Sequence, residues 1–154
     1  MFGNPRESEV VMHYNGGYLI GQISKLTNRR VNELLKESEI NEFNAAQGTI
    51  IFVLYKEGPM QIKDIGKKTG LAKTSLTSML ERMEQQGLVK KIENEEDKRS
   101  TIIELCEDTM SFTDALEQIG AQMDEELYKG LKAKEIERFE ATLAKVLKNL
   151  ETQD

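Results

Sequence analysis

A short stretch between Lys73 and Arg82 concentrates hydroxyl and cationic side chains on one side of a predicted helix. At about 100° per residue, Leu76, Leu80 and Met83 fall together on the other side. The polar side consists of Lys73, Thr74, Ser75, Thr77, Ser78 and Arg82. Hydroxyl groups donate and accept hydrogen bonds, and cations attract phosphate, so such a face can contact DNA in the major groove. The alternative is an ordinary solvated helix face, although Ser and Thr are poor helix formers.

A second polar group follows in a segment with β-favouring residues. Its members are Lys90, Lys91, Asp97, Lys98 and Arg99. An arginine on a hairpin tip suits a narrow minor groove, where negative potential is concentrated. Asp97 lies two residues before Arg99 and can hold its guanidinium through a charge-assisted pair. The alternative is a generic charged hairpin, which the neighbouring Glu93, Glu95 and Glu96 favour.

Apolar periodicity and turn residues predict the elements that position these two groups. Helices are expected at about 18–36, 44–55, 62–68, 72–86, 112–127 and 136–150, and strands at 88–93 and 100–105. The two short helices are joined by a tight turn at Thr69–Leu71, and Gly87 ends the second. A helix-turn-helix followed directly by a hairpin is a winged helix. The predicted fold class is therefore mainly α with a small β-hairpin, a winged helix-turn-helix flanked by N- and C-terminal dimerisation helices.

The expected organisation has three parts. Residues 1–42 form an N-terminal helix of the dimerisation region, 43–105 a winged helix-turn-helix DNA-binding domain, and 106–154 C-terminal dimerisation helices. The terminal helices carry apolar faces that have too little covering material within the chain. Burial of these faces between two copies would supply the missing cover, so a homodimer is expected.

Composition excludes several classes of protein. The single cysteine, Cys106, excludes an intramolecular disulfide framework, and the absence of a long apolar run or a signal-like N-terminus predicts a cytoplasmic protein with no membrane partner. The net charge of −6 is uneven, because residues 106–154 hold 6 Lys/Arg against 12 Asp/Glu, whereas residues 60–105 hold 9 against 8. The acidity thus lies mainly outside the predicted DNA-binding helix and hairpin.

The run QIKDIGKKTGLAKTSLTSMLERMEQQGLVKKIENEEDKRSTIIEL resembles the core of the MarR family of bacterial regulators. Its segment EEDKRS is similar to that family's wing signature, an Asp-x-Arg followed by a small residue, and Gly130-Leu131 resembles the junction before the last helix. The resemblance extends over about residues 18–150. It departs at Ala72, where the family often has an N-capping Ser, at Cys106-Glu107-Asp108, and at Lys132.

The resemblance implies that Arg99 enters the minor groove, that Asp97 orients it, and that the polar helix contacts bases and phosphates. It further implies a homodimer that binds a pseudo-palindromic DNA site and acts as a repressor, released by a small aromatic or anionic effector. The sequence identifies no effector pocket. Tyr14, Tyr18, Phe43, Phe52 and Tyr55 are candidates for its lining, with burial in the core as the alternative.

Other functions are less well supported by the sequence. It contains no phosphate loop, nucleophile elbow or Cys/His arrangement, so no enzyme and no cofactor are expected. No metal site is expected either, because His13 is the single histidine and Cys106 is distant from it. Redox sensing by Cys106 is less favoured than a small buried hydrophobic role. The alternative function is a winged-helix module that binds another protein without sequence-specific DNA binding.

Overall fold

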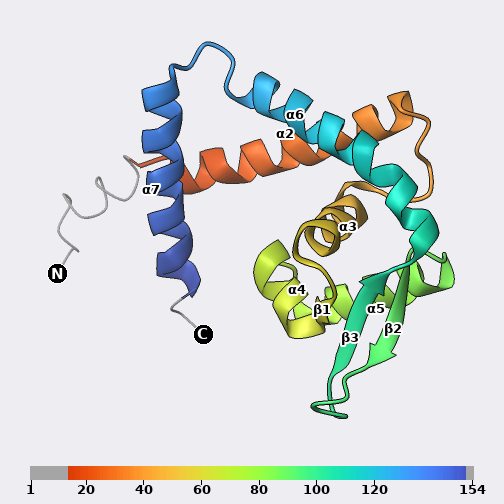
Figure 1. Ribbon diagram of the computed structural model, residues 1–154. Coiled ribbons are helices and arrows are strands. Elements are labelled where there is room, and N and C mark those ends of the chain that lie inside the picture. The colour runs from red at the N-terminus through yellow and green to blue at the C-terminus, as the bar shows by residue number, and fades with distance from the viewer. Residues whose placement is uncertain (1–13, 152–154) are drawn as a thin grey trace, which may run out of the picture. The chain divides into compact units, whose positions relative to one another are not determined.

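The computed structural model describes residues 14–151, which form two compact units, one up to Ile119 and one from Gly120 onward (Figure 1). The elements are α2 (Gly16–Glu37), α3 (Ala45–Glu57), β1 (Met60–Gln61), α4 (Ile62–Thr69), α5 (Lys73–Gln85), β2 (Val89–Glu93), β3 (Thr101–Leu105), η1 (Glu107–Phe112), α6 (Thr113–Leu127) and α7 (Ala133–Glu151). The mainly α class and the order helix, turn, helix, hairpin are confirmed. None of the helices within this described part is both long and apolar enough to cross a membrane.

The sheet has one strand more than the predicted hairpin. β2 and β3 pair antiparallel from Val89↔Leu105 to Glu93↔Thr101, as expected, but β1 adds to the other side of β3 in the order β1-β3-β2. β1 was not predicted, because two residues are too few to show an alternating pattern. Its pairing with β3 is also made across a long sequence separation. The 3-10 helix η1 before α6 was likewise not predicted.

The core of the N-terminal unit is built around the helix-turn-helix and the sheet. Ile50 and Ile51 of α3, Ile65 of α4, Leu76 of α5 and Ile103 of β3 are each at most 1% exposed. Burial of a Leu or Ile side chain stabilises the fold by about 1.5–3 kcal/mol. The apolar side of α5 therefore fixes which of its faces remains at the surface.

Two glycines set the ends of the helices that flank the turn. Gly70 ends α4 with φ +73°, and Gly87 follows α5 with φ +77°, a left-handed conformation that residues with a Cβ adopt at a cost. After Gly87 the chain is held by a hydrogen bond from the Leu88 N–H to the Met83 carbonyl at 2.9 Å. The chain thus leaves α5 directly into β2, as the sequence predicts.

Polar side chains, one of them buried, join three helices of this unit. Asn44 and Gln47 form a capping box at the start of α3, and Asn32 of α2 accepts from the Ala45 N–H at 2.8 Å. Gln47, only 5% exposed, donates to the Gln86 side chain at 3.2 Å, just beyond the end of α5. A buried amide needs such partners. The C-terminal end of α5 is thereby tied to the start of α3.

The C-terminal unit contains the second half of α6, the turn around Gly130 and α7. The Tyr128 ring meets Phe139 edge-on at 6.3 Å between centroids, and its hydroxyl donates to Glu140 at 2.7 Å. This bond to a carboxylate raises the pKa of Tyr128 above 10.0. α7 begins without a Ser or Thr cap; instead Glu135 accepts from the Lys132 N–H at 3.2 Å.

Candidate nucleic-acid interface

The outer side of α5 presents most of the polar residues that the sequence singles out. Leu76, Leu80 and Met83 are at most 1% exposed and hold the helix against the core. The residues Lys73, Thr74, Ser75, Ser78 and Arg82 are exposed. Thr77 is half-buried, and its hydroxyl donates to the Lys73 carbonyl at 2.9 Å, so its proton is used within the helix. Thr77 can therefore act toward a ligand only as an acceptor.

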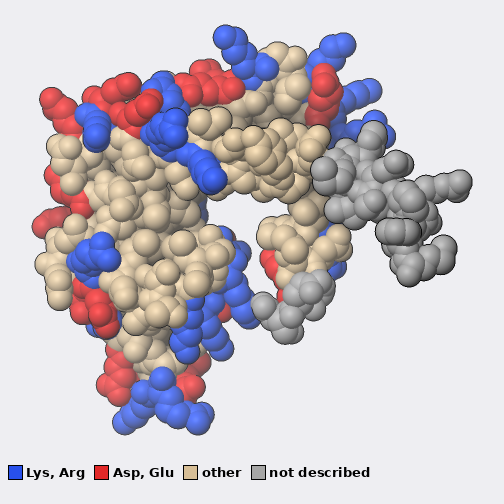
Figure 2. All heavy atoms as spheres, turned by 180° about the vertical axis from the view of Figure 1, so that it is seen from behind, with Lys and Arg blue, Asp and Glu red and all other residues tan. Residues whose placement is uncertain are grey.

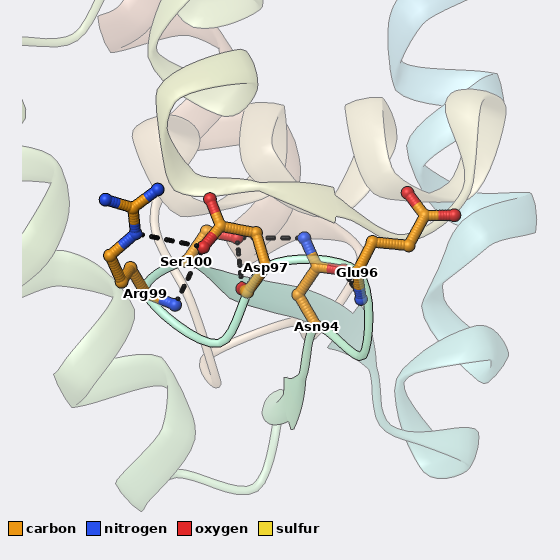
Figure 3. A network of polar contacts seen from close by, with 5 residues as sticks. All are labelled: Asn94, Glu96, Asp97, Arg99 and Ser100. Carbon is orange, nitrogen blue, oxygen red and sulfur yellow. Dashed lines mark hydrogen bonds and ion pairs between the residues drawn. The ribbon is translucent and has the colours of Figure 1, made fainter.

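The tip of the wing, which we define as residues 94–100 between β2 and β3, carries the predicted Asp97–Arg99 pair. Asp97 Oδ1 lies 3.3 Å from Arg99 Nε and accepts from the Arg99 backbone N–H at 3.0 Å. The side chain of Arg99 is 93% exposed, that of Asp97 47%. An ion pair this exposed contributes little to stability. Its consequence is geometric: it restricts the direction in which the guanidinium extends into solvent (Figure 3).

The two lysines of β2 are less exposed than Arg99, at 56% and 39% of the side chain, and both lie near carboxylates of other elements. Lys90 Nζ lies 3.6 Å from Glu104 of β3, and Lys91 Nζ lies 3.8 Å from Glu84 of α5. Neither carboxylate was predicted from the sequence to pair with these lysines. The first could have been found, because the hairpin register places Lys90 directly opposite Glu104. Lys98 at the tip is exposed.

Three carboxylates of the wing, Glu93, Glu95 and Glu96, line a hollow at its base. The hollow is open, measures about 510 Å³ and lies beside β1 and the base of the wing. Its lining comprises Pro59, Met60, Gln61, Asp64, Glu93, Asn94, Glu95, Glu96 and Ile102. In Figure 3 the side chains of Arg99 and Glu96 extend to opposite sides of the loop. Lys and Arg atoms occupy the outer end of the wing in Figure 2, with Asp and Glu atoms on both sides just above them.

The aromatic candidates for an effector pocket lie in different environments. Phe43 is buried and meets Phe112 edge-on at 5.3 Å. Phe52 and Tyr55 of α3 each have the Lys56 ammonium about 5.4 and 5.3 Å from the ring centre. Tyr14 and Tyr18 are 73% and 67% exposed. None of the five lines the hollow beside the wing. An effector site therefore stays a prediction.

Lys56 also links α3 to α6. Its Nζ donates to Glu117 at 2.7 Å, and this hydrogen bond raises the pKa of Lys56 above 10.5. Cys106, directly after β3, is half-buried. Within residues 14–151, no group of three or more His, Cys, Asp or Glu side chains is placed to hold a metal ion, and His13 lies outside this range.

A helix packed by its apolar side, with a polar outer side and a hairpin immediately after it, defines a winged helix-turn-helix protein. Comparison with known proteins agrees. Residues 43–101 match the model of the MarR family. The chain is 28% identical to the multiple antibiotic resistance protein MarR of Escherichia coli (strain K12), covering 85% of this chain and 90% of that protein. It is 29% identical to the HTH-type transcriptional regulator YwhA of Bacillus subtilis, covering 67% and 74%.

Solved structures show the same relation. A cysteine-to-serine variant of the E. coli MarR in complex with operator DNA superposes with a TM-score of 0.74 at 28% identity, over 85% of this chain and 92% of that chain. A MarR regulator of Methanosarcina mazei reaches 0.76 over 90% and 97%, and at 14% identity supports the fold alone. The chain is thus similar to transcriptional regulators of the MarR family, through the family match at residues 43–101 and through relatives matched over most of its length. The proteins that it matches act in the regulation of transcription and not as enzymes.

Proposed function

We propose that this chain binds a pseudo-palindromic operator as a homodimer and represses transcription until a small molecule releases it. The observation that carries the DNA-binding part is the Asp97–Arg99 pair, a 93% exposed guanidinium held at the tip of the wing. An arginine that is already directed outward suits insertion into a minor groove. The relative from E. coli, which is 28% identical, has been solved with operator DNA.

The proposed contacts fall into two groups. α5 lies in the major groove and contacts bases and phosphates through Lys73, Thr74, Ser75, Thr77, Ser78 and Arg82. The wing contributes Arg99, oriented by Asp97, with Lys98 as a phosphate contact. Lys90 and Lys91 contribute less than unpaired lysines would, because each has a carboxylate within 3.8 Å.

The homodimer is supported by apolar side chains that each unit leaves exposed. On α2, Leu19 and Leu26 are 53% and 56% exposed; on α7, Leu147 and Leu150 are 58% and 65% exposed. Exposed apolar side chains in such numbers mark an interaction surface. A two-fold dimer would place two α5 helices about 34 Å apart, which is one turn of DNA.

Repression and release by an effector are proposed from the relatives. A 22% identical protein of Pseudomonas putida is named a transcriptional repressor, and the E. coli relative is named a multiple antibiotic resistance protein. We expect a small aromatic or anionic effector. A compound of this class that lowers the DNA affinity of the purified protein would support release.

The decisive experiment is a titration of the protein against the DNA upstream of its own gene, followed by fluorescence anisotropy at several salt concentrations. We expect Arg99→Ala to weaken binding by about 1–3 kcal/mol and to reduce the salt slope by about one, because it removes one contact to the DNA. Arg138→Ala, which removes one arginine from α7, is the matched control and should leave the slope unchanged.

Two outcomes would contradict the proposal. If the protein binds no duplex at about 50 mM salt, where phosphate contacts are strongest, the chain is better described as a protein-binding module. The carboxylates Glu93, Glu95 and Glu96 on the wing would then be the first candidates for the partner surface. If Arg99→Ala binds as the original protein does at fixed salt, the wing takes no part in recognition.

A further inference from the structure

Asn94 is a buried polar residue in a loop whose other polar residues are largely exposed. It follows Glu93, the last residue of β2, and is 7% exposed, whereas Glu95, Glu96, Lys98 and Arg99 are exposed. A buried side-chain amide is costly unless its donors and acceptors are satisfied. The contacts that satisfy Asn94 therefore show what holds the loop.

Both ends of the Asn94 amide are engaged within the wing (Figure 3). Its Nδ2 donates to Ser100 Oγ at 2.8 Å, and its Oδ1 accepts from the Glu96 N–H at 3.1 Å. Because a backbone N–H can only donate, the atom that faces Glu96 has to be the amide oxygen. The orientation of the amide is thus fixed by its surroundings.

From Ser100 the network continues to Arg99. The Ser100 hydroxyl donates to the Asp97 carbonyl at 3.0 Å, and the Ser100 N–H donates to the same oxygen at 3.1 Å. The Asp97 carboxylate in turn accepts from the backbone N–H of Arg99 and pairs with its Nε. Asn94 is therefore connected to the guanidinium of Arg99 through two intermediate residues.

The hydrogen-bond network lies just beyond the last residue pair of the hairpin, where it can hold the wing tip. The ladder between β2 and β3 ends at Glu93↔Thr101, so Asn94 and Ser100 are the next residues outward. Their side-chain hydrogen bond continues the cross-link where the strand ladder stops. We infer that Asn94 is a positioning residue for DNA binding: it fixes the wing tip so that Arg99 is presented in its binding direction. This inference rests on the proposed function.

Position 94 needs a side chain with one donor, toward Ser100 Oγ, and one acceptor, toward the Glu96 N–H, and asparagine has both. Aspartate would offer two acceptors and no donor, and the single Ser100 hydroxyl proton could then serve either Asp97 or position 94, but not both. Alanine would leave the loop without the cross-link. An unfixed tip has to be ordered when DNA binds, and that ordering lowers affinity without removing any contact.

The test compares Asn94→Ala, Arg99→Ala and the double variant by DNA-binding anisotropy over a range of salt concentrations. We expect Asn94→Ala to weaken binding about five- to tenfold, the effect of losing one or two hydrogen bonds, with an unchanged salt slope. Arg99→Ala should lower the slope. In the Arg99→Ala background, Asn94→Ala should have a much smaller effect, since Lys98 is then the one proposed DNA contact left at the tip.

Folding of Asn94→Ala is checked by circular dichroism. If it does not fold, Ser100→Ala replaces it, because that variant removes the same hydrogen bond from the other partner. An Asn94→Ala affinity equal to that of the original protein overturns the inference. So does an equal loss in both backgrounds, which would show a general effect on the fold. If the unmodified protein does not bind DNA, the proposed function itself is overturned. That result differs from a failure of the inference about Asn94, in which the unmodified protein still binds DNA.

Discussion

At the scale of single residues, the cations of the wing differ in how accessible they are to a partner. Arg99 and Lys90 each have a carboxylate nearby, Asp97 at 3.3 Å and Glu104 at 3.6 Å, but the side chain of Arg99 is 93% exposed and that of Lys90 is 56% exposed. A neighbouring carboxylate weakens the attraction of both cations for phosphate, and the more exposed cation is the one that a phosphate can reach. The two positively charged groups of the wing are thus unequal, and the tip is the better placed of them to contact DNA.

The bond between Tyr128 and Glu140 gives a prediction about pH. Because the neutral hydroxyl donates to a carboxylate, the pKa of Tyr128 is raised above 10.0. The folded protein therefore holds this proton more tightly than the unfolded chain. Its stabilising effect is present below pH 10 and is lost as the pH rises through the raised pKa.

Glu140→Gln should lower the pKa of Tyr128 back toward its ordinary value. The measurement is the absorbance of tyrosinate near 295 nm during an alkaline titration, with Tyr128→Phe used to subtract the other three tyrosines. A titration curve of Glu140→Gln that overlays the original would show that the hydrogen bond is absent in solution.

At the scale of elements, the N-terminus of α5 lacks a side-chain cap for its first backbone N–H groups. Ala72 has the extended conformation of an N-cap residue, with φ −64° and ψ 142°, but alanine has no side-chain acceptor for the first-turn N–H groups. This matches the departure at Ala72 that the sequence shows from the family pattern. Serine at that position would accept a hydrogen bond from one of them.

Ala72→Ser should therefore raise the free energy of unfolding by about 0.5–2 kcal/mol. The measurement is a urea titration followed by circular dichroism, with Ala121→Ser at an exposed position in the middle of α6 as the control. The control should be neutral or destabilising, since serine is a poorer helix former than alanine. Equal changes in both variants would show that capping is not the cause.

The elements also show how far the sequence could predict the fold and the site. Helices with sustained apolar periodicity were found, and Gly70 and Gly87 placed their ends, because left-handed backbone favours glycine. The pair Asp97–Arg99 was found because its spacing is local. β1 and the Asn94–Ser100 bond were missed, because a two-residue strand has no period and a cross-loop bond depends on the path of the loop.

At the scale of the whole molecule, the proposed function depends on a second copy of the chain. The last third is acidic, with 6 Lys/Arg against 12 Asp/Glu in residues 106–154, so it is an unsuitable surface for DNA. Its helix α7 nevertheless leaves apolar side chains exposed, among them Phe139 at 42% and Leu147 at 58%. An acidic unit with an apolar stripe is suited to bind protein.

Ending the chain at Lys134 removes almost all of α7 and should give a monomer or an aggregate, because the apolar cover between two copies is lost. Since truncation can also disturb folding, Leu147→Glu tests the same surface with a single charge.

Ala141→Glu is the matched control for Leu147→Glu. It lies six residues away and about 120° round the helix, away from the apolar stripe. Sedimentation velocity should show the control as a dimer and Leu147→Glu shifted toward monomer, with weaker binding to a two-half-site operator. A truncated chain that stays monomeric, folded and fully competent to bind DNA would contradict the homodimer, and with it the pseudo-palindromic operator.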